Sequence, residues 1–341
     1  MKIVIGTNIM FYEYGMLDDY LTSIKNAIDT VKEEDDIRVE LDFFINCDQT
    51  FEKFDGDIDK HCLEMKDKIR GYFDYARTKN YVNGTIHSSD SMIFYEPPPV
   101  TMTSYRRWLN TEYSHYDYVI WGETDCLVPH VIFHALKQLR LKTNSLEIYR
   151  YIATFATRKM WDESWKPLEL DIFEDKEYYE STDPRSKTEL HSIRRYMTID
   201  EMNKINSKVE DLKINSITSP KFDGSILVIT GDLIQAGANI PSGFWGLSGE
   251  DTAFMQSCMN VMKTHYVQFI FKNILKVHNR EHPLKRQKVL TIDGEPSTQE
   301  NKGSLYNKVR DVNKYNLATL TNPSLLRKKM ISYTEFIKEN N

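Results

Sequence analysis

The most constraining feature of the sequence is the alternation of apolar patterns in its first fifty residues. The segment KIVIG has the composition of a buried strand, residues 17–31 carry apolar side chains at helical spacing, and RVELDFFIN indicates a second strand. A strand, a helix and a second strand form a βαβ unit, which belongs in a parallel sheet covered by helices. Ligands of such sheets bind at the carboxyl ends of the strands. We therefore expect Thr7 and Asp48, which follow these two strands, to line one rim.

The same alternation predicts an α/β chain with an insertion. Strand and helix patterns continue to about residue 155 and return from 223 to 290, whereas 156–222 is largely polar and acidic, with one clear helix near 199–212. Residues 291–320 carry few apolar anchors and are expected to form a loose loop or lid, followed by a C-terminal helix. The other expected helices are at 58–79, at 103–115, after Pro129, from about 250 and at 323–339. The other expected strands are at 92–96, within 116–122 before Glu123, within 146–161 and at 225–230.

Composition disfavours some classes of partner and location. The formal charge is -6, with 44 Lys+Arg against 50 Asp+Glu, so no overall basic field favours nucleic acid or anionic lipid. No apolar run approaches the ~20 residues that span a bilayer, and the N-terminal strand is too short for a signal peptide. The cysteines share no CxxC spacing, which predicts reduced thiols in a cytoplasmic protein. They are Cys47, Cys62, Cys126 and Cys258.

Two carboxylates follow the most hydrophobic predicted strand. The sequence YDYVIWGETDCLVP runs from that strand into Glu123 and Asp125. Because side chains alternate along a strand, residues two apart point the same way. Convergent carboxylates repel unless a cation shares them, and Mg²⁺ or Mn²⁺ binds such oxygens together with substrate phosphates. The competing interpretation is that Asp125 caps the next helix and Glu123 is a solvated loop acid.

A second pair of acids begins a predicted helix. In SGFWGLSGEDTAF, Phe244 and Trp245 stand among glycine and serine residues, just before Glu250 and Asp251. Acids in the first helical turn suit the helix dipole, which is a structural reason for their presence. That reason does not explain the aromatic pair. Aromatic rings beside carboxylates suit a site that holds a sugar and deprotonates a hydroxyl.

The segment VHNREHP supplies two more candidate ligands. His278 and His282 are four residues apart, so on a helix they could share one metal ion, although the acidic third position of the zinc helix is missing. Solvated surface histidines are the alternative interpretation. Three basic residues, Lys285, Arg286 and Lys288, follow, and they are either diphosphate contacts of a closing lid or solvated side chains.

Taken in order, these segments resemble the GT-A glycosyltransferases, most closely the inverting family-2-like members. The segment YRRWLNTEYSHYDYVIWGETDCLVP is similar to the family's arginine, helix, strand and acidic-x-Asp triplet before proline. The segment GSILVITGDLIQAGANIPSGFWGLSGEDTAF is similar to its strand, helix and aromatic-glycine loop before a Glu-Asp pair. The resemblance covers about 1–155 and 220–285. Trp108 replaces the usual Asn, Glu123 replaces the commoner Asp, and the insertion has no counterpart.

The resemblance implies a fold, a division of the chain and a role for each candidate. The fold would be a GT-A, Rossmann-like, mostly parallel sheet flanked by helices, with a helical or irregular insertion and a C-terminal helical extension. Residues 1–290 would be the catalytic domain, with a nucleotide-binding half at 1–155, the insertion at 156–222 and an acceptor-binding half at 223–290, and 291–341 would be the lid and C-terminal helix. The implied nucleotide contacts are Thr7, Asp48, Arg107, Glu123 and Asp125. The implied metal ligands are Asp125, Glu123 and His278, with His282 as the alternative to His278. Asp251 would be the base, supported by Glu250, and Phe244 and Trp245 would contact the acceptor.

The implied activity is inverting transfer of a sugar from a nucleotide-sugar, a UDP-sugar foremost, with Mn²⁺ or Mg²⁺. The acceptor would be a glycan, a lipid or a small molecule. Three alternatives stay open: a glycosyltransferase acting on a modified nucleic-acid base, which acidic charge disfavours, a sugar nucleotidyltransferase, and a non-catalytic carbohydrate-binding relative. Trp161 and Trp165 of the insertion are either acceptor platforms or core residues.

Overall fold

The structure is a computed structural model of the 341-residue chain. It describes residues 1–88, 101–157, 197–217, 220, 223–245, 249–279, 282, 284–298, 301–321 and 329–340. The strand expected at 92–96 and the tryptophans of the insertion lie outside these residues. Among the described residues, no helix combines the length and hydropathy that crossing a bilayer requires.

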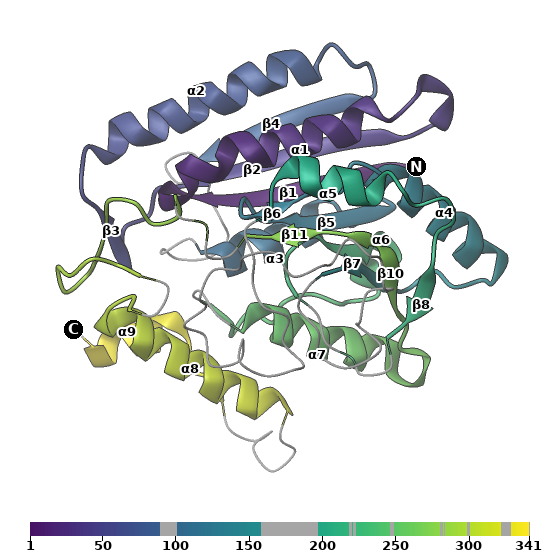
Figure 1. Cartoon of the computed structure of the whole chain (residues 1–341). Helices are drawn as coiled ribbons and strands as arrows, with labels where there is room; N and C mark the ends of the chain where they lie inside the picture. The colour runs from purple at the N-terminus through teal and green to yellow at the C-terminus, as the bar shows by residue number, and fades with distance from the viewer. Residues whose placement is uncertain are drawn as a thin grey trace.

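A central sheet of eight strands organises the molecule (Figure 1). Adjacent strands are parallel except at β9 and β8, which run antiparallel to their neighbours. The expectation of an α/β fold with a mostly parallel central sheet is therefore confirmed. In spatial order the strands are β4 (Val82–Ser88), β2 (Arg38–Asn46), β1 (Lys2–Met10), β5 (Tyr118–Gly122), β9 (Leu227–Thr230), β7 (Ile152–Ala156), β10 (Gln268–Leu275) and β8 (Ile214–Ser216).

Helices cover both faces of the sheet, and each face has its own apolar core (Figure 1). The larger core lies under helices whose apolar residues recur at three- and four-residue spacing, as the sequence pattern predicts. Those helices are α1 (Leu17–Asp29), α2 (Ile58–Ala76) and α4 (Ile132–Ser145). The second core lies under α3 (Met102–Glu112), α6 (Gly231–Gln235) and α7 (Glu250–Met262).

The first strand is longer than the sequence pattern predicts. It continues to Met10, so Thr7 lies inside the strand and not at its end, and that expectation is wrong. Thr7 has no exposed surface, and its hydroxyl is 2.6 Å from that of Tyr20. A side chain at Gly122, its partner on β5, would collide with both hydroxyls. Thr7 therefore belongs to the packing of the sheet.

The C-terminal region is more ordered than the sequence pattern predicts. In place of a loose loop over 291–320, the described residues include the helix α8 (Ser304–Thr321), and α9 (Tyr333–Asn340) follows. These helices pack on the rest of the molecule through Val309 and Phe336, which contact Phe51 and Trp245. Before them, β12 (Val289–Thr291) pairs with β3 (Glu52–Phe54), so the chain is joined to the central part of the molecule where the expected lid begins.

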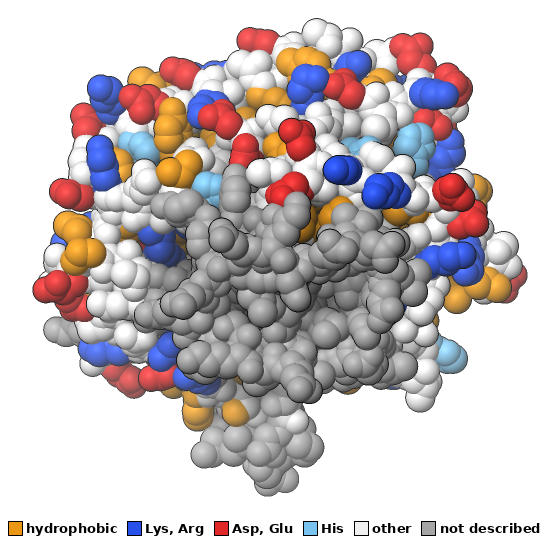
Figure 2. Space-filling view, in the orientation of Figure 1, with side chains coloured by type: hydrophobic (Ala, Val, Ile, Leu, Met, Phe, Trp, Pro, Cys, Tyr) orange, Lys and Arg blue, Asp and Glu red, His pale blue; other side chains and the backbone are white. Residues whose placement is uncertain are grey.

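The described part of the insertion is also built onto the sheet. Thr198 caps the N-terminus of helix α5 (Ile199–Asn206), and β8 forms the edge strand beside β10. Acidic and basic side chains are interspersed across the described surface in Figure 2, in keeping with the small net charge.

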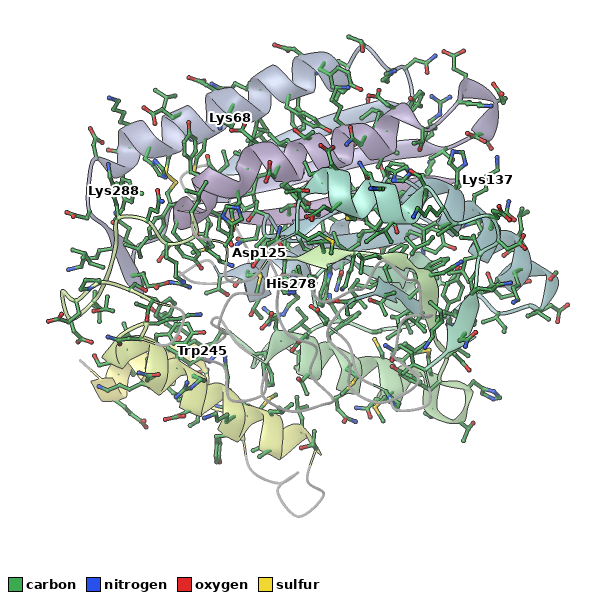
Figure 3. All side chains as sticks on the ribbon, in the orientation of Figure 1. Lys68, Asp125, Lys137, Trp245, His278 and Lys288 are labelled. Carbon is green, nitrogen blue, oxygen red and sulfur yellow. A yellow bond between two sulfur atoms is a disulfide. The ribbon has the colours of Figure 1, made fainter. Side chains whose placement is uncertain are left out.

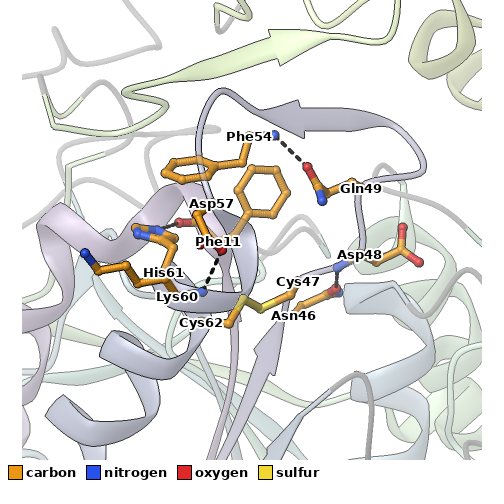
Figure 4. The surroundings of a disulfide bond; sticks show 10 residues. All are labelled: Phe11, Asn46, Cys47, Asp48, Gln49, Phe54, Asp57, Lys60, His61 and Cys62. Carbon is orange, nitrogen blue, oxygen red and sulfur yellow. Dashed lines mark hydrogen bonds between the residues drawn. A yellow bond between two sulfur atoms is a disulfide. The ribbon is translucent and has the colours of Figure 1, made fainter.

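One disulfide corrects the expectation of four reduced thiols. Cys47 and Cys62 are bonded, with their Cα atoms 6.6 Å apart, whereas Cys126 and Cys258 are free and buried. Figure 4 shows the bond joining the segment after β2 to the first turns of α2, beside Asp48. Sequence spacing did not indicate this pair, because the two residues meet only when α2 folds back onto the sheet.

Candidate functional site

The site forms around the end of β5, where the apolar strand gives way to carboxylates. Glu123 follows Gly122 directly, and Asp125 comes two residues later. Asp125 is 4% exposed. Next in the chain, β6 (Cys126–Leu127) pairs antiparallel with β11 (Val277–His278), with His278 opposite Cys126. The amide of Asn279 also donates to the carbonyl of Asp125, at 2.6 Å. This short ribbon places the imidazole beside both acids.

Glu123, Asp125 and His278 offer three ligand atoms that all lie within 4.8 Å of one another. The Nε2 atom of His278 is 3.5 Å from Glu123 Oε2 and 3.4 Å from Asp125 Oδ2. Figure 3 shows Asp125 and His278 side by side near the middle of the molecule. The arrangement could hold a divalent cation. His278 lies in a strand, however, so the expectation of a shared helix with His282 is wrong, and His282 lies outside this group.

A third carboxylate holds the other side of the imidazole. His278 Nδ1 is 3.4 Å from Asp223 Oδ2 and 3.3 Å from the hydroxyl of Ser225. Burial alone would lower the pKa of His278, but Asp125 and Asp223 raise it to about 9. A carboxylate on the far nitrogen is how proteins commonly orient a metal-binding histidine. Asp223 was not predicted from the sequence, because it stands before a strand and not after one. Since β9 runs antiparallel, its N-terminal end lies at this rim.

Lys285 lies against the same acidic group. Its Nζ is 2.6 Å from Asp125 Oδ2 and 3.5 Å from Glu13 Oε1. Burial would raise the pKa of Asp125, but Lys285 and then His278 hold it well below its usual range. Lys285 is thus neither a solvated lysine nor free to bind a diphosphate in this conformation. It compensates a carboxylate that could hold a metal ion.

The second pair of acids stands at the start of α7, as predicted. Glu250 is 6% exposed, and Asp251 is half-buried with its carboxylate accepting from the amide of Thr252 at 2.6 Å. Burial and then the charge of Asp251 raise the pKa of Glu250 to about 7, against the opposing effect of Arg106. Gly249, at φ 85°, precedes them and takes a backbone conformation that favours glycine.

Arg106 connects the two acidic groups. It is 2% exposed and donates to Glu123 at 2.6 Å and to Glu250 at 3.0 Å. The arginine predicted from the sequence was its neighbour Arg107, whose guanidinium donates to the carbonyls of Ile240, Pro241 and Phe244. A signal for Arg106 was present, since it is three residues before Leu109 in the buried stripe of α3.

The predicted aromatic platform is closed in this structure. Phe244 is 1% exposed and packs in the core beneath α3, α6 and α7. Trp245 is 6% exposed, packs against Tyr333 and Phe336, and donates its indole N–H to the carbonyl of Ile331. The expectation of open rings is corrected because the C-terminal helices cover them.

A small pocket lies near the ends of β1 and β2. Asp48 lines it, and one of its carboxylate oxygens accepts from the amide of Thr50 at 2.8 Å. This is the rim where the sequence placed Asp48. The other lining residues are Met10, Phe11, Asn46, Phe51, Glu52 and Thr101.

Comparison with known proteins gives distant structural likenesses. No protein-family model matches the sequence, and no curated protein matches it. Among solved structures, TarS 1–349 from S. aureus in complex with UDP is 9% identical over 81% of this chain and 59% of its own, with a TM-score of 0.41. GalNAc-T7 with UDP, GalNAc and Mn²⁺ is 10% identical over 100% and 54%, with a TM-score of 0.46. Mouse xyloside xylosyltransferase 1 is 9% identical over 69% of each chain, with a TM-score of 0.32.

The chain therefore spans less than two thirds of the first two of these structures. At such identities and TM-scores, the likeness assigns no activity to this chain. What the site does must follow from its own side chains.

Proposed function

We propose that this chain is a metal-dependent glycosyltransferase of the GT-A type. It moves a sugar from a nucleotide-sugar, a UDP-sugar foremost, to an acceptor hydroxyl with inversion. The observation that carries the proposal is the joint position of two acidic groups. Glu123, Asp125 and His278 lie together, and the buried Arg106 links them to the start of α7, where Glu250 and Asp251 stand.

The first group suits a divalent cation that also binds phosphate. Carboxylates suit Mg²⁺ and Mn²⁺, whereas an imidazole is a better ligand for a transition metal. Asp125, Glu123 and His278 would thus hold Mn²⁺ in preference to Mg²⁺. When bound, the ion would act as a Lewis acid that neutralises the charge of the departing diphosphate. Asp223 would keep the imidazole turned toward the two acids.

The second group suits a general base. Asp251 is half-buried and lies in the first turn of α7, so its carboxylate can take a proton from an acceptor hydroxyl that comes within hydrogen-bond distance. Glu250 is paired with Arg106 and is better suited to hold this end of the site in place. Attack on the face of the sugar opposite the diphosphate would invert the anomeric centre.

The nucleotide would extend from the metal toward the ends of β1 and β2. Asp48 lines the pocket there and has the hydrogen-bonding capacity to contact a base or a ribose. Arg107 would serve the nucleotide only if it exchanged its contacts with the 240–244 loop. An acceptor contact by Trp245 would likewise require α8 and α9 to move, whereas a contact by Phe244 would require the core beneath α3, α6 and α7 to open.

A binding experiment tests the proposal. The structures of TarS and GalNAc-T7 contain UDP, so UDP and UDP-GlcNAc with Mn²⁺ are suitable first probes. A ligand at a hundredfold excess over its Kd stabilises the native state by about 2.7 kcal/mol, which a thermal-shift measurement detects. We expect stabilisation by a nucleotide-sugar that requires Mn²⁺, and slow Mn²⁺-dependent hydrolysis of the same donor. If a panel of nucleotide-sugars gave neither effect, the proposal would be wrong.

A further inference from the structure

Arg106 is the buried arginine that spans the site. Its guanidinium comes from α3 and meets two acids that lie far away in the sequence. The Nη2 atom is 2.6 Å from Glu123 Oε1, and the Nη1 atom is 3.0 Å from Glu250 Oε1. One planar group therefore holds one oxygen of each carboxylate.

The environment fixes the plane of this guanidinium. It stacks over the ring of Trp121 at 4.6 Å, and Nη2 also donates to the carbonyl of Gly224 at 3.2 Å. A Cβ atom at Gly224 would lie 2.9 Å from Nη1, so the backbone approaches closely only because no side chain is present. Because these contacts fix the guanidinium, the guanidinium in turn fixes the positions of the two carboxylates that it binds.

The contacts leave a defined part of Glu123 free to face the histidine. Arg106 engages Oε1, whereas Oε2 is the oxygen 3.5 Å from His278 Nε2. Glu123 can then present only one oxygen to a cation between the acids and the histidine. The other end of the same guanidinium sets where Glu250, and with it the first turn of α7, lies relative to that cation.

We propose that Arg106 is a positioning residue that fixes Glu123 as a single-oxygen ligand and sets the spacing between the metal site and the acids of α7. This inference rests on the proposed function, because it assigns how the metal-side and base-side acids of that reaction are kept in register. Lysine cannot replace arginine in this role, since a point charge lacks the rigid fork that binds two carboxylates at once. A role limited to charge compensation would accept lysine.

The test compares three variants with the wild type. Arg106→Lys keeps the charge and removes the fork. Arg106→Met alone would remove the arginine from the buried Glu250 and the partly buried Glu123 and can fail to fold, so it is combined with Glu250→Gln. Arg140→Lys is the matched control, since Arg140 forms an ion pair with Asp117 at 2.5 Å outside the site. The measurements are the spectrum and Kd of bound Mn²⁺ by electron paramagnetic resonance, and kcat and KM for Mn²⁺-dependent hydrolysis of UDP-GlcNAc or of the donor identified by binding.

For Arg106→Lys we expect an altered Mn²⁺ spectrum and a fall in kcat of about tenfold to a hundredfold, the usual cost of misplacing reacting groups by about 1 Å. KM should change by less than about threefold, because binding of the ground state is not what the residue controls. The double variant should also show the altered Mn²⁺ spectrum, while Arg140→Lys should match the wild type.

Two results with the variants would overturn the inference. One is an Arg106→Lys protein with the Mn²⁺ spectrum and kcat of the wild type. The other is an altered spectrum in Arg140→Lys as well, which would indicate a general loss of structure. A wild type that binds Mn²⁺ but processes no nucleotide-sugar would refute the proposed function alone, and the Mn²⁺ spectra of the variants would still decide on Arg106. A wild type that binds no Mn²⁺ would refute both.

Discussion

The acids at the end of β5 and the acids at the start of α7 are compensated in different ways. Asp125 lies against the flexible side chain of Lys285, at 2.6 Å, and against His278, at 3.4 Å. Glu250 lies against Arg106, which is stacked and hydrogen-bonded into the core. Within the first group, Asp125 therefore has cations that an incoming metal ion could replace, whereas Glu250 and one oxygen of Glu123 are held by an arginine that is built into the fold.

This difference separates two tasks within one rim. A group that exchanges its cation can bind and release a ligand with each turnover. A carboxylate that is paired with an immobile arginine can stay in one place during the whole catalytic cycle. Changes at the first group should therefore alter metal binding, and changes at the second should alter turnover or stability without abolishing binding.

The largest effect is expected for Asp125→Asn. Loss of this carboxylate removes a proposed metal ligand, and a Lewis acid contributes several kcal/mol to the transition state, so activity should fall by about a thousandfold or more. Mn²⁺-dependent binding of the nucleotide should also disappear in calorimetry. The matched control is Asp18→Asn on α1, a carboxylate 74% exposed and paired with Lys68. Normal Mn²⁺ binding by the Asp125→Asn protein would contradict the assignment.

The next effect is expected for Asp251→Asn, which keeps the shape of the side chain and removes the proposed base. Turnover of the donor should fall by about a hundredfold to ten-thousandfold, the usual contribution of general base catalysis. The Kd values of Mn²⁺ and UDP should stay within about threefold of the wild type, because the first acidic group is untouched. Loss of UDP binding in parallel with turnover would show that the two groups are not separate.

A smaller change of opposite sign is expected for Lys285→Met. Removing the ammonium leaves Asp125 free to hold a divalent ion, so Mn²⁺ alone should bind more tightly. Unit charges 4 Å apart repel by about 4 kcal/mol at an effective dielectric constant near 20. Because the ammonium of the wild type can swing away from an incoming ion, we expect only part of this repulsion to be relieved, and the gain in affinity to be about tenfold. Lys137→Met, which removes an ion pair with Asp35 elsewhere, serves as control. Unchanged or weaker Mn²⁺ binding would mean that Lys285 does not compete with the ion.

The last expected effect concerns stability alone and leaves binding and turnover aside: it is the dependence of stability on pH that Glu250 confers. Its pKa is raised from 4.5 to about 7, so the native state binds more protons than the unfolded state between these values. The contribution of Glu250 to stability should therefore fall as pH rises through this window and level off above it, by on the order of 3 kcal/mol. Urea denaturation of wild type and Glu250→Gln across the window measures this. A constant difference between the two proteins would be inconsistent with a raised pKa.

Local patterns predicted the elements that carry the acids. The strand that ends at Gly122 and the helix that begins at Glu250 both follow from periodicity and from glycine and acidic residues at the boundaries. The acids themselves could be selected because strand ends and helix starts are identifiable positions. That Glu123 and Asp125 lie beside His278 could be expected only through the family resemblance.

Long-range contacts account for what was missed. Asp223 reaches the rim because β9 is antiparallel, and strand direction has no local signal. Adjacent arginines on a helix face different ways, and the spacing to Leu109 indicates that Arg106 is the buried one, but only the packing of α3 decides that it meets Glu123 and Glu250. Trp245 is buried by Val309 and Phe336, which are distant in the chain. In each case the contact that determines the position of the side chain is made with residues far away in the sequence, which local periodicity cannot detect.

The bond between Cys47 and Cys62 has a consequence for handling the protein. It ties the segment before Asp48 to α2, at the edge of the pocket proposed for the nucleotide. Disulfides form in oxidising surroundings and are rare where glutathione keeps thiols reduced. Chain made in a reducing host and chain made in an oxidising one are therefore two chemical species. A nucleotide affinity measured for either is interpretable only beside a count of its free thiols.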